Sequence, residues 1–187
     1  MHYKLYKPFG MLSQLSSNDA KEARNKRFLS ELYNFPSGIM PIGRLDEKSE
    51  GLLLMTTDGK LSDIINRAGI EKEYYAQLDG EITDLAIDQL ARGVEIGFSG
   101  KKYMTKTCVA KRLTKIPIFP EANAKLRIGR HRPTSWVSIC VKEGKYRQIR
   151  KMTAAVGFPT LRLVRVRIGA IELRGLQVGE VVPLQQI

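Results

Sequence analysis

Residues 43–59 read GRLDEKSEGLLLMTTDG and join a charged loop to an uninterrupted apolar run. The apolar segment at 52–57 has the length of a buried strand, and the Asp58-Gly59 pair directly after it is a turn signal. The stretch therefore predicts a buried strand, a tight turn and then a helix over residues 61–67.

The rest of the chain holds further short segments with either the alternating pattern of a strand or the apolar spacing of a helix. Strands are expected at residues 2–7, 72–79, 103–113, 125–142, 161–168 and 170–173, and helices at 83–93 and 146–156. Helices and strands do not alternate as regular βαβ units, which favours the α+β class. We expect a mixed, mainly antiparallel central sheet flanked by helices and loops.

The charged loop holds the first candidate for chemistry. Asp46 lies between Arg44 and Lys48, and a loop carboxylate can act as a nucleophile or a base. Taken alone, an Arg-x-Asp loop more often makes a structural salt bridge. Glu47 and Glu50 are expected to be solvated, because nothing pairs them with Asp46 as acid and base partners.

Basic residues are concentrated in the second part of the chain. Residues 1–100 hold 12 Lys/Arg against 15 Asp/Glu, a net charge of −3, whereas residues 101–187 hold 19 against 4, a net charge of +15. Such a surplus indicates a polyanionic partner, and nucleic acid is favoured over a membrane because no basic amphipathic helix is apparent. A merely solvated basic surface is the alternative.

Several other classes of protein are disfavoured. Cys108 and Cys140 are the only cysteines, and no Cys/His set has metal-ligand spacing, so we expect no disulfide framework and no metal site. No segment approaches the roughly 18 apolar residues of a membrane span, and the start has no apolar signal region. No phosphate-binding glycine motif is present, so no cofactor is expected. A cytoplasmic protein without a membrane partner fits best.

Two tyrosines form the second candidate site. Tyr74 and Tyr75 are adjacent in the segment KEYYAQLDG, so in a strand they point to opposite faces of the sheet. One of them could stack on an unpaired base, a contact worth about 1 to 3 kcal/mol. Ordinary packing within the sheet is the competing interpretation.

Arginines and lysines form the third candidate site. Arg147, Arg150 and Lys151 are three and four residues apart in EGKYRQIRKM and would share one helical face. Arg165 and Arg167 alternate with apolar residues farther on. A phosphate or carboxylate could bind there, although a generic basic surface explains these side chains about as well.

Taken together, the motifs resemble the RsuA-type ribosomal pseudouridine synthases. GRLDEKSEGLLLMTTDG, KEYYAQLDG, EGKYRQIRKM and LVRVRIGAIEL occur in the family's order, and YKPFGMLS near the start extends the likeness over nearly the whole chain. The S4-like RNA-binding domain of many members does not precede these motifs, which resembles the E-type branch that modifies large-subunit rRNA.

The resemblance implies a role for each candidate residue. Asp46 would be the essential aspartate, Tyr74 the aromatic side chain that stacks on the target uracil, and Arg150 the partner of Asp46. Leu163 would line the uracil pocket. The substrate-binding cations would be Arg44 on a backbone phosphate, together with Arg147, Lys151 and Arg165. Ser49 and Glu50 depart from the family's usual Thr-Ser pair.

The family's architecture and reaction complete the expectation. It implies the pseudouridine synthase fold in a single catalytic domain, residues 1–187, with two closely joined lobes at about 1–68 and 69–187 and the active-site cleft between them. The reaction would isomerise one uridine, in 23S rRNA, after base flipping, and a monomer is expected. Loops 16–26 and 116–133 are candidates for substrate selection. The rivals are a noncatalytic RNA-binding or ribosome-assembly factor and a synthase acting on tRNA.

Overall fold

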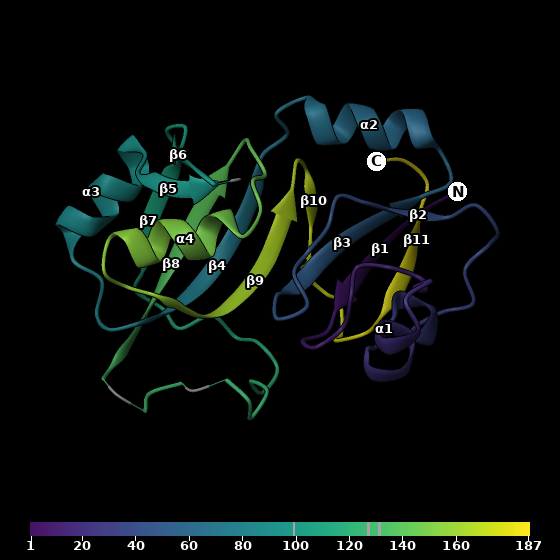
Figure 1. Ribbon diagram of the computed structural model, residues 1–187, viewed down its shortest axis with the longest axis horizontal. Coiled ribbons are helices and arrows are strands. Elements are labelled where there is room, and N and C mark those ends of the chain that lie inside the picture. The colour runs from purple at the N-terminus through teal and green to yellow at the C-terminus, as the bar shows by residue number, and fades with distance from the viewer. Residues whose placement is uncertain (99, 127, 131) are drawn as a thin grey trace. The chain divides into compact units, whose positions relative to one another are not determined.

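The predicted apolar strand is present as β3 (Glu50–Thr56) in the computed structural model, which describes residues 1–98, 100–126, 128–130 and 132–187 (Figure 1). All seven residues of β3 are buried. Chain contacts divide the protein into two units. The first comprises Met1–Ile70 and Val164–Ile187, and the second comprises Glu71–Leu163.

The first unit contains a mixed sheet with the strand order β11-β1-β3-β9. These strands are β11 (Val181–Leu184), β1 (His2–Lys7), β3 and β9 (Thr160–Ile168), of which the part from Val164 onward belongs to this unit. β1 is antiparallel to β3 and to β11, whereas β3 and β9 are parallel. β2 (Met40–Ile42) pairs antiparallel with β3, and β10 (Ile171–Glu172) pairs antiparallel with β9. β1 thus covers one edge of β3, and β2 and β9 cover the other.

Local capping explains the helices of the first unit. The Asp58 carboxylate accepts hydrogen bonds from the backbone N–H groups of Lys60 and Leu61, so the predicted turn starts α2 (Gly59–Arg67). Asp19 caps α1 (Ala20–Asn25) through the N–H of Glu22. A single 3-10 turn, η1 (Leu29–Glu31), follows. One core cluster of this unit, to which η1 contributes Leu29, contains Tyr3, Leu5, Met11, Leu29, Ile39, Leu53 and Met55.

The second unit contains an antiparallel sheet with the order β4-β8-β7, built from β4 (Lys72–Asp79), β8 (Thr134–Val141) and β7 (Val109–Leu113). β5 (Glu95–Phe98) and β6 (Lys101–Met104) form a separate hairpin. One sheet face packs against α3 (Asp84–Arg92) and α4 (Gln148–Ala155), since residues of β4, β8 and both helices belong to one core. That core is made by Ala76, Leu78, Ile82, Ala86, Leu90, Ile96, Val137, Ile139, Val141, Ile149, Met152 and Leu163.

The α+β class and the mixed, mainly antiparallel sheet are confirmed, while some boundaries were wrong. The strand expected at 103–113 is interrupted, because the backbone N–H groups of Thr105 and Cys108 bond to the carbonyls of Val94 and Ala91 instead of a strand partner. The strand expected from 125 begins only at Thr134, and residues 127 and 131 of that segment lie outside the described residues.

The lobes expected at about 1–68 and 69–187 stay a prediction. In the structure the first unit ends at Ile70 and takes up the chain again from Val164 to the end. The strand pairing of β9 with β3 and of β11 with β1 accounts for this return of the chain.

Candidate active site

Asp46 lies in the loop between β2 and β3, and it is partly exposed. Its backbone carbonyl accepts a hydrogen bond from the N–H of Ser49 at 2.9 Å, which closes a turn before the strand. The preceding residue, Leu45, is buried. Ser13 fixes that residue, because its Oγ donates to the Leu45 carbonyl at 2.9 Å and accepts from the Leu45 N–H at 3.0 Å. Asp46 therefore lies in a loop with a defined backbone.

A buried lysine supports the same loop. Lys7 is fully buried at the end of β1, and its ammonium donates to the carbonyls of Pro8 at 2.8 Å, Met11 at 2.6 Å and Glu47 at 3.4 Å. Burial lowers the pKa of Lys7 from 10.5 to about 7, although the negative charges of Glu50, Glu47 and Asp46 oppose the shift. Sequence reasoning missed this residue.

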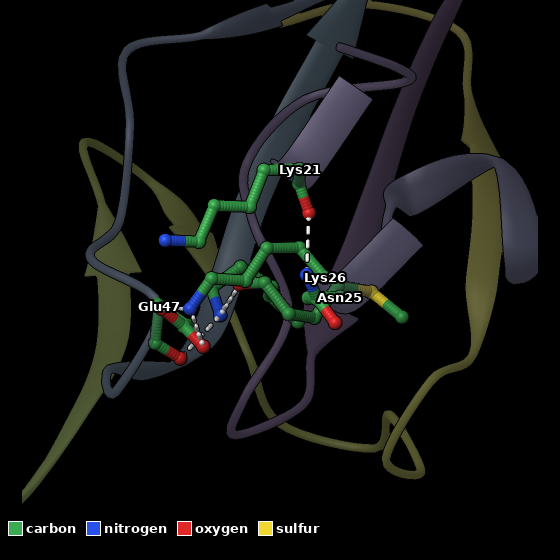
Figure 2. A network of polar contacts seen from close by, with 6 residues as sticks. Lys21, Asn25, Lys26 and Glu47 are labelled. Atoms are coloured by element: carbon green, nitrogen blue, oxygen red, sulfur yellow. Dashed lines mark hydrogen bonds and ion pairs between the residues drawn. The ribbon is translucent and has the colours of Figure 1, made fainter. Parts of the chain in front are cut away.

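Glu47 and Glu50, which were expected to be solvated, make specific contacts. Glu50 is the first residue of β3 and is buried, since it lies in the paired part of the strand. Glu47 forms an ion pair with Lys26 at 2.8 Å, and both side chains are about one-third exposed (Figure 2). The expectation of two solvated carboxylates was wrong, because strand pairing buries one and a lysine neutralises the other.

Gly51 and Arg165 pair where the start of β3 lies against β9. Gly51 has a φ of +103°, and an added Cβ would lie 2.3 Å from the Arg165 carbonyl oxygen. Arg165 is buried, and its Nε donates to the Leu52 carbonyl at 2.8 Å. This side chain has a structural contact in the first unit, and its predicted role in RNA binding stays a prediction. Arg44, by contrast, is exposed in the loop.

In the second unit, Tyr74 and Tyr75 occupy opposite faces of β4, as the alternation predicted. Tyr74 is partly buried and packs against the core shared with α3 and α4. Tyr75 contacts Phe119 with a ring-centroid separation of 6.2 Å on the other face, where Phe119 also packs against Trp136.

The basic motif around α4 differs from the predicted continuous helix. Arg147 is the N-cap, with a left-handed backbone (φ 53°, ψ 33°), so it does not share a helical face with Arg150 and Lys151. Two hydrogen bonds close the turn before α4 and fix where the helix begins. The Gln148 N–H donates to the Lys145 carbonyl at 3.0 Å, and the Lys145 N–H donates to the Gln148 side-chain oxygen at 2.9 Å. Arg147 is exposed.

The other two cations make contacts inside the second unit. Arg150 is partly buried and donates to the Thr160 carbonyl at 3.3 Å. The Lys151 ammonium donates to the Gly97 carbonyl at 2.7 Å and lies 5.4 Å from the centroid of the Tyr146 ring. Leu163 is buried in the core of this unit. Its predicted place in a uracil pocket and the predicted pairing of Arg150 with Asp46 stay predictions.

Glu143 organises the turn before α4 and was also missed. Its carboxylate accepts hydrogen bonds from the Tyr103 hydroxyl at 2.6 Å, the Lys106 N–H at 2.9 Å and the Gln148 amide at 2.7 Å. Burial alone would raise the pKa of Glu143, but these bonds hold it below its usual value. The acidic first residue of EGKYRQIRKM was the signal that could have found it.

Two further findings concern metals and membranes. Across the described residues, no group of three or more His, Cys, Asp or Glu side chains could hold a metal ion. None of the described helices has the length and apolar character that a membrane span requires.

Comparison with known proteins places this geometry in a family. Residues 2–155 match the RNA pseudouridylate synthase family. Ribosomal large subunit pseudouridine synthase E of Xanthomonas campestris pv. campestris is 38% identical over 94% of this chain and 91% of the relative. The protein of the same name from Vibrio parahaemolyticus is 36% identical over 93% of this chain and 69% of the relative.

Solved structures agree with the sequence relatives. A crystal structure of a pseudouridylate synthase superimposes with a TM-score of 0.75 at 27% identity, covering 98% of this chain and 70% of the other. The chain belongs to the RNA pseudouridylate synthase family, a family of enzymes. The predicted resemblance to the E-type branch and the predicted pseudouridine synthase fold are thereby confirmed.

Proposed function

We propose that the protein isomerises one specific uridine of ribosomal RNA, in the 23S rRNA of the large subunit, to pseudouridine, with Asp46 as the catalytic carboxylate. The observation that carries this proposal is the GRLD loop itself. It presents a partly exposed Asp46 while Ser13, Lys7 and Gly10 fix the backbone on both sides of it. The names of the relatives, which refer to the large ribosomal subunit, support the choice of rRNA.

The reaction needs a carboxylate but no external reactant. The C1′–N1 bond of uridine breaks, the uracil rotates, and C5 bonds to C1′ while the C5 proton is lost and N1 gains a proton. Asp46 can serve by attacking the sugar, by attacking the uracil or by removing a sugar proton. Because the product is an isomer of the substrate, no cofactor or energy source is required.

Access to the glycosidic bond requires base flipping. Extruding a uridine from a helix costs a few kcal/mol, which stacking and phosphate contacts offset. We assign stacking on the uracil to Tyr74, and phosphate contacts to the exposed Arg44 and Arg147. Lys151 and Arg165 are weaker candidates for RNA contacts, since each already donates to a backbone carbonyl.

The remaining assignments come from the family resemblance. We propose that Arg150 pairs with Asp46, that Leu163 lines the uracil pocket, and that the chain acts as a single catalytic domain and a monomer. Loops 16–26 and 116–133 are proposed to select the substrate. The first of these contains α1, and residues 127 and 131 of the second lie outside the described residues.

Mapping of pseudouridine tests the proposal and identifies the target. Deproteinised rRNA and tRNA lacking the modification are incubated with the protein, treated with a pseudouridine-specific adduct reagent and read by reverse transcription. We expect one new stop, in 23S rRNA. A stop only in tRNA would overturn the rRNA assignment. Salt-sensitive RNA binding without a stop in free RNA or partly assembled subunits would favour a noncatalytic RNA-binding factor.

A further inference from the structure

Glu47, the residue that follows Asp46, is held through both its backbone and its side chain. Its backbone carbonyl accepts hydrogen bonds from the Gly10 N–H at 2.8 Å and from Lys7 at 3.4 Å. Its two carboxylate oxygens accept from the Lys26 ammonium at 3.0 and 2.8 Å (Figure 2). None of the residue roles in the proposed function uses this side chain.

Lys26 is itself fixed at the end of α1. Its N–H donates to the Glu22 carbonyl at 2.9 Å, and it is the C-cap of the helix. The Asn25 amide donates to the Lys21 carbonyl at 2.8 Å, as Figure 2 shows. The backbone carbonyl of the next residue, Arg27, accepts from the Leu12 N–H at 2.9 Å, which joins this segment to the chain after β1. The backbone that carries the Lys26 side chain is therefore fixed.

The loop carries three carboxylates, and its two basic residues offset only part of their charge. These carboxylates, Asp46, Glu47 and Glu50, lie within five residues, and their charges oppose the lowering of the pKa of Lys7 that burial causes. Like charges at this spacing repel, and a polyanionic RNA would add to the repulsion. Without the ion pair to Lys26, the Glu47 side chain could change its rotamer. The peptide bond between Asp46 and Glu47 would then be held less firmly.

We propose that Glu47 is a positioning residue for Asp46 and that Lys26 is its partner, so that the end of α1 sets the place of the carboxylate. This inference rests on the proposed function. Small displacements of a reacting group lower a rate steeply. Because the pair is about one-third exposed, we expect its loss to slow the reaction by about three- to fivefold rather than abolish it.

Four variants test the role: Glu47→Gln, Lys26→Met, the double variant, and the exchanged pair Lys26→Glu with Glu47→Lys. Single-turnover rates at saturating rRNA are measured beside the RNA dissociation constant. We expect Glu47→Gln to lose about three- to fivefold in rate with unchanged RNA affinity. The double variant should be no slower than the slower single variant, and the exchanged pair should recover most of the rate.

Glu31→Gln is the matched control. It is the same chemical change and removes an ion pair of the same length, 2.8 Å, to the neighbouring Arg27, but the known contacts of Glu31 are to Arg27 and Phe28 rather than to the Asp46 loop. It should react at the wild-type rate. Thermal unfolding of every variant should remain close to that of the wild type, since the lost pairs are partly exposed.

The outcomes separate the two proposals. A Glu47→Gln variant with the wild-type rate, or additive losses in the double variant, would overturn the positioning role while the activity of the wild type stands. A defect confined to RNA affinity would overturn it too, because Glu47 and Lys26 would then act in binding. A wild type that forms no pseudouridine would overturn the proposed function and, with it, this role.

Discussion

Replacing Lys7 by methionine should remove a pH dependence of stability that the buried ammonium creates. Burial lowers the pKa of Lys7 in the folded protein to about 7, whereas the unfolded value is 10.5. Between these values the unfolded chain binds one more proton than the folded chain, so the free energy of unfolding rises with pH across this window. Below pH 7 both states are protonated and the contribution is constant.

The magnitude follows from the two pKa values. A difference of about 3.5 units corresponds to about 5 kcal/mol over the whole window, or about 1.4 kcal/mol per pH unit at its middle. Urea unfolding of the wild type and of Lys7→Met is measured at intervals from pH 7 to 9.5. The wild type should gain stability relative to the variant by about 1 kcal/mol or more for each pH unit.

A lysine on the surface supplies the control. Lys60 is exposed on α2, and Lys60→Met should follow the wild type at every pH. Parallel curves for Lys7→Met and the wild type would refute the reasoning. If Lys7→Met does not fold, because three carbonyls lose a donor, an NMR titration of the Lys7 side chain in the wild type decides the matter. A midpoint near 10.5 would contradict the account.

Two further predictions concern the strand start and the stacking residue. Gly51→Ala should lower the free energy of unfolding in urea by about 2 kcal/mol or more, because φ is positive and the new Cβ meets the Arg165 carbonyl. Gly175→Ala, where φ is also positive but the space is open, should lower it less. Equal losses in the two variants would contradict the steric reason. Tyr74→Phe should keep most single-turnover activity, whereas Tyr74→Ala should lose roughly tenfold or more. Near-complete activity in both Tyr74 variants would rule out stacking.

The features that the sequence predicted well are those that a local pattern determines. The apolar run before Asp58 had to be a buried strand followed by a capped helix, and β3 and α2 are both present. The alternation in KEYYAQLDG placed Tyr74 and Tyr75 on opposite faces, which their different neighbours confirm.

Two kinds of feature were missed: a short helix without an apolar pattern, and burial that depends on distant segments. α1 is a short, polar helix whose start requires the Asp19 cap, and its segment was expected to be a loop. The burial of Lys7 was missed because it also depends on the Asp46 loop, where the Glu47 carbonyl, 40 residues later, accepts from its ammonium. Glu50 was expected in solvent because its burial depends on the pairing of β3 with β9, more than 100 residues later.

The central claim is that Asp46 is the catalytic carboxylate of a pseudouridine synthase, and release of tritium from rRNA labelled at uridine C5 tests it most directly. Forming the C5–C1′ bond displaces the C5 hydrogen, so each turnover releases one label. RNA binding and thermal unfolding are measured beside it for the wild type and Asp46→Asn. We predict release by the wild type and none by Asp46→Asn, which should still fold and bind RNA. Equal release by the two proteins would contradict the account.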